Sequence, residues 1–334
     1  MKHKFTLDYL KSLHEDEFIH WTAVHMGPSN SKWGENEGYI WNERLKQFLI
    51  QQGAAVTFMD DTNIKPYISR FFKDRSNEVI IATNYDFGIA KVTDRNKRGD
   101  KGTVQDNING YMSQHYRFHS ASDLDMNSDD LYIVTHPENG GGFPEVYDIF
   151  NHPPDHIKRI YSKGLMCINH EKFRPLPNGI CNLNINNIRK KTIYHEEKTD
   201  TPLNLLVLNF RDNTNVERLK LYDYYQDQFW ATFGNGSQYE YLREMYHHKF
   251  VLSPESNCAD SHRTWEALYM GSIPIVQKTP TMSVFDDLPI LQVDDITKCD
   301  PAFLKDKYEE MMEQEWNLDK LKMSYWLDQI KEDL

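Results

Sequence analysis

The sequence predicts an α/β fold in two halves, on the basis of three observations. Short apolar runs alternate with polar, helix-like stretches along the first half of the chain. A charged segment without a clear pattern, residues 189–203, interrupts the alternation and is expected to link two domains. The alternation then restarts, and helical patterns follow from Pro301 onward. Since strands separated by helices form βαβ units, each half is expected to hold a parallel sheet.

Composition indicates a folded, acidic protein with a sizeable core. The chain has 334 residues, of which 39% are hydrophobic and 13% aromatic, and this is too apolar for a disordered chain. The net charge is −12, whereas a nucleic-acid binder typically has a basic surface, so no nucleic-acid partner is expected.

Cysteine usage and the N-terminus bear on the compartment. The four cysteines are scattered and include no C-x-x-C pair, which favours free thiols in a reducing compartment over a zinc ribbon or a disulfide scaffold: Cys167, Cys181, Cys258 and Cys299. The first residues lack the apolar core of a signal peptide, and no apolar run approaches the length of a membrane span. We therefore expect a soluble, cytoplasmic protein without a transmembrane segment.

The first half contains five apolar runs that are typical of buried strands. They cover residues 18–24, 54–60, 78–84, 130–136 and 164–169. Between the first two, residues 39–53 carry helically spaced apolar side chains and end at Gly53, which suits a helix C-terminus. Strand, helix and strand in this order predict a βαβ unit.

The second half repeats this organisation. Strands are expected at 203–210, 249–253, 273–276 and 288–293, and helices at 218–229 and 239–248. Two apolar stripes at helical spacing follow, one from Phe303 to Met312 and one from Leu318 to Trp326. The predicted domains are 1–195, 203–300 and a C-terminal helical part, 301–334, that packs back toward the N-terminal domain.

The segment DSHRTWEALYMGSIPIV, residues 260–276, combines a charged helix start with a buried strand. The preceding strand ends at Pro254, Asp260 or Ser261 is expected to cap the helix, and Gly271 is expected to end it. In an open α/β sheet, ligands lie at the carboxyl ends of the strands and face the positive end of the next helix.

Arg263 and Glu266 lie one turn apart at this helix start and have two interpretations. Arg263 would supply donors for a diphosphate, and Glu266 would accept hydrogen bonds from a ribose beside it. Alternatively, the two form an ordinary surface ion pair worth a few tenths of a kcal/mol. Spacing alone does not choose between them.

Residues 249–276 resemble the nucleotide-sugar-binding region of exostosin-like glycosyltransferases. That family carries an R-x-x-E-A-L-x-x-G-x-I-P motif, which Arg263, Glu266, Gly271 and Pro274 match in register. Residues 205–223 resemble the first strand and helix of the same domain, and 174–180 resemble the proline-rich segment before it. One departure is that the loop between Pro254 and His262 lacks the expected glycines and carries Ser256, Cys258 and Ala259.

The resemblance implies a two-domain GT-B fold and a hexosyl- or pentosyltransferase. The donor would be a nucleotide sugar, preferably a UDP-sugar, and the acceptor an oligosaccharide or other glycan. Transfer would proceed with inversion and without a metal, so no metal cofactor is expected. The implied donor-binding residues are Arg263, Glu266, His262, Ser261, Asn209, Arg211, Ser253 and Asn257.

In GT-B enzymes the catalytic base usually comes from the N-terminal domain. It must take a proton from the acceptor hydroxyl, so an acidic residue or a histidine at a strand end is expected. Asp86, in the turn 84–88 that closes the run 78–84, is the first candidate, and a plain turn residue is the alternative. His136 is the second candidate, and a hydrogen-bonded structural histidine is its alternative.

Two rival functions remain open from the sequence. A GT-A enzyme would need a metal-binding D-x-D motif, for which Asp60-Asp61 or Asp123-Leu124-Asp125 would have to serve. A non-catalytic carbohydrate-binding protein would explain the missing loop glycines. Other metal signals are weak, because His115 and His119 lack the glutamate of H-E-x-x-H and 123–134 lack the glycine and glutamate of a calcium loop.

Overall fold

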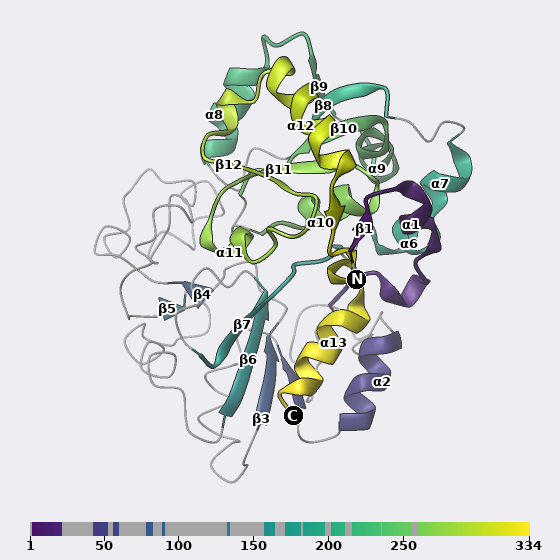
Figure 1. The fold of residues 1–334 in the computed structure, drawn as a ribbon, viewed down its shortest axis with the longest axis vertical. Coiled ribbons are helices and arrows are strands. Elements are labelled where there is room, and N and C mark those ends of the chain that lie inside the picture. The colour runs from purple at the N-terminus through teal and green to yellow at the C-terminus, as the bar shows by residue number, and fades with distance from the viewer. Residues whose placement is uncertain are drawn as a thin grey trace.

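The chain adopts a mixed α/β fold in the computed structural model (Figure 1). The structure describes residues 2–21, 43–52, 56–59, 78–82, 89–90, 132–133, 157–163, 171–181, 183–197, 202–210, 216–234, 236–255 and 260–334.

A five-stranded sheet dominates the second half and is parallel throughout, in the order β12-β11-β10-β8-β9. This confirms the predicted α/β class. The strands are β8 (Asn204–Leu208), β9 (Ala231–Phe233), β10 (His248–Leu252), β11 (Ile273–Gln277) and β12 (Leu291–Val293). Pro274 lies inside β11. The pairing of β11 with β12 begins one residue later, at Ile275, so the missing N–H of the proline interrupts no pairing between these two strands.

Helices connect these strands and cover the sheet. They are α8 (Val216–Tyr225), α9 (Gln238–His247), α10 (His262–Tyr269), α11 (Pro280–Ser283), the 3-10 turn Ile296–Lys298 and α12 (Pro301–Glu313). A capping box fixes the start of α9, because the Ser237 hydroxyl accepts from the Glu240 N–H while the Glu240 carboxylate accepts from the Ser237 N–H. Helix α8 ends at Tyr225, four residues before the predicted end at 229.

A second parallel sheet has the order β2-β3-β6-β7. Its strands are β2 (Val56–Met59), β3 (Glu78–Ala82), β6 (Ile157–Lys163) and β7 (Phe173–Leu176), and α2 (Glu43–Gln52) precedes β2. Strands β2 and β3 fall inside predicted runs. Strands β6 and β7 were not predicted, because Lys158, Arg159 and Lys163 interrupt the apolar pattern of β6 and Pro175 lies in β7, at the sheet edge.

Three predictions in the first half need correction or lie outside the description. Residues 18–21 form no strand, although their apolar side chains are buried in the core. The Ile19 N–H donates to the Tyr269 hydroxyl, and the Trp21 indole donates to the Pro177 carbonyl. Within 130–136, only β5 (Tyr132–Ile133) is described, and it pairs antiparallel with β4 (Ile89–Ala90), apart from the parallel sheet. The run 164–169 lies outside the described residues.

The expected linker is partly helical. Helix α7 (Thr192–Glu196) lies within the segment 189–203, and helix α6 (Ile185–Arg189) ends at its first residue. Glu197 holds the end of α7 to α9, since its carboxylate binds Arg243 at 2.5 Å and His247 at 2.8 Å.

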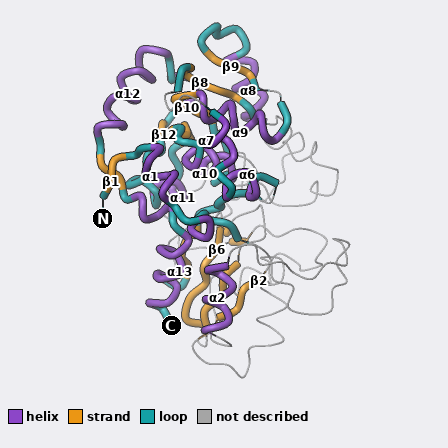
Figure 2. The backbone as a smooth tube through the Cα atoms, turned by 90° about the vertical axis from the view of Figure 1, so that its right-hand side faces the viewer, coloured by secondary structure: helices purple, strands orange, loops and turns teal. Residues whose placement is uncertain are grey.

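Both ends of the chain contact the other half of the sequence. At the N-terminus, β1 (His3–Lys4) pairs antiparallel with β13 (Glu315–Trp316), and α1 (Leu7–Ser12) and the 3-10 turn Glu15–Glu17 follow. At the C-terminus, α13 (Met323–Glu332) follows the 3-10 turn Leu318–Leu321 and lies beside α2, as Figures 1 and 2 show. The Tyr161 hydroxyl of β6 donates to the Asp333 carboxylate at 2.6 Å.

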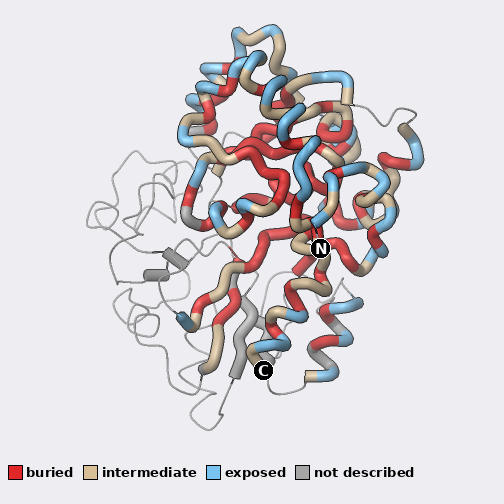
Figure 3. The backbone as a smooth tube through the Cα atoms, in the orientation of Figure 1, coloured by how far each residue is buried: buried red, intermediate tan, exposed pale blue. Residues whose placement is uncertain are grey.

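The core is centred on the five-stranded sheet and α10 (Figure 3). Trp265, Ala267, Leu268 and Tyr269 of α10 are fully buried. No helix in the described ranges combines the length and apolarity that crossing a bilayer requires.

Candidate functional site

The candidate site lies at the carboxyl edge of the five-stranded sheet, where α10 begins. Because β8, β10 and β11 are parallel, their carboxyl ends meet at one edge. Asn209 and Phe210 follow β8, and Ser253 and Pro254 follow β10. Helix α10 starts at His262, so the positive end of its dipole faces this edge.

Arg263 is held in the first turn of α10 by the end of β8. Its guanidinium donates to the Asn209 carbonyl at 3.0 Å and approaches the Asn209 side-chain oxygen at 3.4 Å. The same guanidinium lies 5.4 Å from the Phe210 ring centre and 5.6 Å from that of Tyr241. These aromatic contacts hold the planar guanidinium by cation–π attraction. They leave other N–H donors of the guanidinium available for a ligand.

The start of α10 carries no side-chain cap, which corrects the expectation for Asp260 and Ser261. Ser261 occupies the N-cap position, yet its side chain makes no capping hydrogen bond. Its hydroxyl instead pairs with the Ser253 hydroxyl at 3.0 Å, and Ser253 also pairs with Thr264 at 2.9 Å. This buried hydroxyl cluster joins the end of β10 to the first turn of α10, and the Ser261 side chain supplies no acceptor to the N–H groups of that turn.

Asp260 is fully buried and serves the packing of α10 instead of capping it. Its carboxylate accepts from the Trp265 indole at 2.7 Å and from the Asn178 N–H at 2.6 Å. Burial raises the pKa of Asp260 to about 7, against the opposing effects of Asn178, Trp265 and the nearby positive charge of Lys163.

Glu266 is also buried, and its carboxylate is held by residues outside α10. One carboxylate oxygen accepts from the Cys181 N–H at 3.2 Å and from the Asn184 side chain at 3.0 Å, and the other accepts from the Tyr241 hydroxyl at 2.8 Å. The ordinary surface ion pair with Arg263 is therefore not the arrangement seen. Burial, followed by the negative charge of Glu266, raises the pKa of the Cys181 thiol to about 12.

The remaining predicted residues divide into two groups. His262 lies at the start of α10, and its Nδ1 is 2.8 Å from the Gly179 carbonyl, so it contacts the segment that follows β7. The structure thus brings His262, Arg263, Ser261, Ser253 and Asn209 together at one edge, whereas the Glu266 carboxylate is buried among Cys181, Asn184 and Tyr241. The candidates that lie outside the described residues are Asp86, His136, Arg211 and Asn257.

Sequence reasoning missed three residues that shape this edge. Tyr241 of α9 links Glu266 to Arg263, because its hydroxyl bonds the first and its ring faces the second. Arg218 of α8 holds the backbone after β10, and Asn178 holds Asp260. No sequence pattern indicated Asn178 or Tyr241, whereas Arg218 is an arginine within an otherwise apolar helix face.

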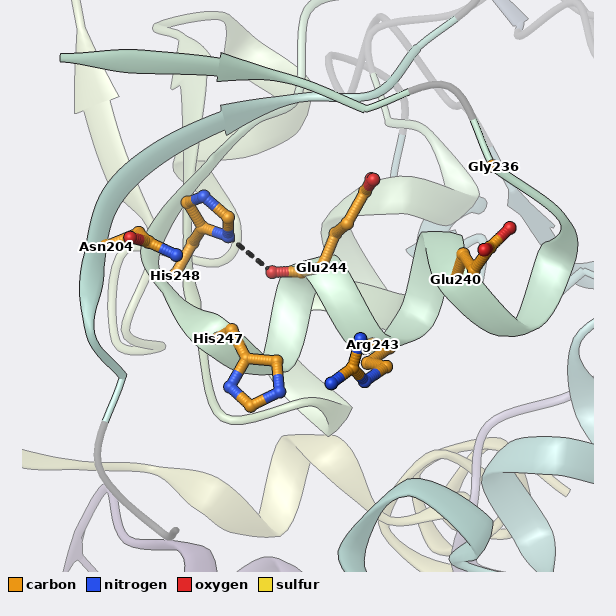
Figure 4. Close-up of a pocket in the computed structure, with 7 residues that line it drawn as sticks. All are labelled: Asn204, Gly236, Glu240, Arg243, Glu244, His247 and His248. Atoms are coloured by element: carbon orange, nitrogen blue, oxygen red, sulfur yellow. Dashed lines mark hydrogen bonds between the residues drawn. The ribbon is translucent and has the colours of Figure 1, made fainter. Parts of the chain in front are cut away.

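A pocket of about 440 Å³ lies along α9, and no residue of α10 belongs to its lining (Figure 4). Its lining is polar and consists of Asn204, Gly236, Glu240, Arg243, Glu244, His247 and His248. Burial raises the pKa of Glu244 and lowers that of His248, whose Nδ1 lies 2.6 Å from the Glu244 carbonyl.

The described ranges contain no group of three or more His, Cys, Asp or Glu side chains arranged to hold a metal ion. The metal signals considered in the sequence lie outside these ranges, namely Asp60-Asp61, His115, His119 and the acidic segment 123–130.

Neither the comparison with protein-family models nor that with curated proteins gives a match to this chain. The functional assignment therefore depends on the geometry of the site and on the resemblance of residues 249–276.

Proposed function

We propose that this chain is a glycosyltransferase of GT-B architecture that transfers a sugar from a nucleoside-diphosphate sugar, a UDP-sugar, to a hydroxyl of a glycan acceptor. The observation that carries the proposal is Arg263, held beside Asn209 at the uncapped start of α10 and at the carboxyl edge of a parallel sheet. This combination of a cationic fork and a helix N-terminus suits a diphosphate.

The proposed reaction is a single displacement with inversion and without a metal. The acceptor oxygen forms a bond to the anomeric carbon, while the bond from that carbon to the diphosphate oxygen breaks. A base takes the hydroxyl proton, and the nucleoside diphosphate leaves with its negative charge. Arg263 and the dipole of α10 would stabilise that charge as it develops. Asp86 is proposed as the base and His136 as the second candidate.

Glu266 is proposed to contact the ribose of the donor. A carboxylate offers about four lone-pair sites, and the three neighbours of Glu266 leave capacity for one more donor. Tyr241 would couple the positions of the two residues, because its hydroxyl bonds the Glu266 carboxylate and its ring lies under the Arg263 guanidinium.

Calorimetry with UDP tests the proposal directly. Arg263→Ala should weaken UDP binding by about 1.5–3 kcal/mol, the value of a hydrogen bond to a charged group, with little loss of stability. Arg243→Ala is the matched control, because Arg243 lies on α9 and is held by Glu197. Unchanged UDP affinity in Arg263→Ala would contradict the assignment.

Turnover separates the rival functions. Donor hydrolysis and transfer, measured with and without glycan acceptors, should both occur for an enzyme and neither for a carbohydrate-binding protein. Activity that survives a chelator supports the GT-B mechanism, whereas loss of activity on chelation would favour a metal-dependent GT-A enzyme.

A further inference from the structure

Arg218 is a buried arginine that binds the backbone after β10, next to the candidate site. It belongs to α8 and is 3% exposed, whereas arginine is rarely buried unless its charge is well satisfied. Its Nε–H donates to the Glu255 carbonyl at 2.7 Å and an Nη2–H donates to the Pro254 carbonyl at 3.1 Å. These two carbonyls belong to the second and third residues after β10.

The guanidinium of Arg218 also contacts the ring that supports Arg263. Phe210 lies 5.4 Å from the guanidinium carbon of Arg218 and 5.4 Å from that of Arg263. One buried cation therefore holds the backbone after β10 and the aromatic side chain after β8 at the same time. Arg263 rests on that aromatic side chain, so its placement depends on the position of Phe210.

Arginine is suited to this task by its geometry. Its planar fork presents N–H donors in fixed directions, so two neighbouring carbonyls can be held in one orientation. Because a trans peptide places C=O and N–H on opposite sides, drawing the Pro254 carbonyl toward Arg218 turns the Glu255 N–H the other way. A backbone held in this manner does not need glycine to keep its orientation.

We propose that Arg218 is a positioning residue for the diphosphate site, which it sets by fixing Pro254, Glu255 and Phe210. The role explains how a chain without the expected loop glycines keeps the start of that loop ordered. As a requirement for nucleotide binding, it rests on the proposed function. Arg218 acts through its neighbours and does not itself contact the donor.

The test compares Arg218→Met with Arg218→Lys and with a control, Arg189→Met. Arg189 is a partly buried arginine of α6 whose side chain binds Asp16. Arg218→Met should lower UDP affinity by about 10- to 100-fold and leave the weaker affinity for uridine unchanged, because only the phosphate contacts depend on the positioned backbone. Arg218→Lys retains a donor for one carbonyl and should recover part of the loss.

Amide hydrogen exchange supplies a readout that needs no nucleotide. Peptides covering residues 250–255 should exchange faster in Arg218→Met than in the wild type or in Arg189→Met, with the remaining peptides unchanged. Unchanged UDP affinity in a folded Arg218→Met would overturn the proposal, and so would unchanged exchange at 250–255. If Arg218→Met does not fold, the same two measurements on Arg218→Lys decide.

A wild-type protein that binds no UDP would defeat the proposed function, and this is seen before any variant is made. It would also overturn the nucleotide part of the Arg218 proposal. Exchange at residues 250–255 would then decide whether Arg218 fixes the backbone.

Discussion

Glu266 and Arg263 lie one turn apart on α10, yet their side chains have different environments. Arg263 lies over two aromatic rings and donates to Asn209, whereas Glu266 is buried among Cys181, Asn184 and Tyr241. Glu266 therefore serves the packing of α10 against the segment after β7, whatever it contributes to a ligand. A buried acceptor of this kind is costly to remove because its donors lose their partner.

Substitution of Glu266 should separate these two contributions. Glu266→Ala leaves the Asn184 amide and the Tyr241 hydroxyl without their acceptor, and each such group costs about 1–3 kcal/mol. Glu266→Gln keeps an acceptor oxygen and should lose less. Urea unfolding measures the stability, and calorimetry with UDP and 2′-deoxy-UDP measures the ribose contact. Equal affinity for the two nucleotides would remove the ribose role and leave the structural role intact.

Helix α10 is defined at its C-terminal end by local chemistry. Gly271 has a φ of +82°, the left-handed conformation that glycine adopts without strain. The Gly271 N–H donates to the Leu268 carbonyl at 3.1 Å and the Ser272 N–H to the Ala267 carbonyl at 3.0 Å, which is the Schellman pattern. The turn leads directly into β11, so it sets the angle between α10 and the sheet.

Gly271→Ala should destabilise the protein for two separable reasons. A left-handed alanine costs about 1–2 kcal/mol, and its Cβ would lie 2.4 Å from the Leu7 Cδ2 of α1. We expect the loss to exceed the backbone cost alone. In the background of Leu7→Ala the steric part disappears, so Gly271→Ala should then cost only the backbone part. Equal losses of stability in both backgrounds would show that Leu7 moves aside without cost and that the steric part is absent.

At the scale of the whole molecule, the segment after β7 joins the four-stranded sheet to α10. Asn178 bonds Asp260, the Gly179 carbonyl meets His262, and Asn184 bonds Glu266. Lys163, at the end of β6, adds a positive charge near Asp260. The start of α10 is thus both the candidate ligand site and the place where the two sheets are connected.

Asp260 should make stability depend on pH. Its pKa is raised from 3.8 to about 7 in the folded protein, so between these values the folded state holds a proton that the unfolded state has released. Its contribution is complete below pH 3.8 and is lost as pH rises through about 7. We expect a loss on the order of a few kcal/mol over this window.

Urea unfolding of the wild type and of Asp260→Asn at several pH values measures this effect. Asparagine resembles the neutral acid, so the wild type should lose stability relative to the variant as pH rises. Taking the difference cancels other titrating groups, including His248, whose pKa is lowered by burial. Parallel curves for the two proteins would contradict the prediction.

Local patterns were sufficient to predict much of the second half. The apolar runs of β8, β10 and β11, the helix that carries Trp265 and its end at Gly271 all depend on neighbours in sequence, through side-chain period and backbone preference. The position of Arg263 at the edge of the sheet follows from the same order of elements. Pattern reasoning failed for β6, where charged residues occupy a strand, and for 18–21, where apolar residues are buried without one.

The partners of the charged groups were decided by tertiary structure alone. Asp260 meets Asn178 and Glu266 meets Asn184 across 82 positions of the chain, and Arg218 meets Pro254 across 36. No local period encodes such pairs, because they arise only when the segment after β7 and helix α8 pack around the start of α10. Burial then changes the chemistry, since a carboxylate removed from water must find donors or hold its proton, and Asp260 and Glu266 owe their roles to that requirement.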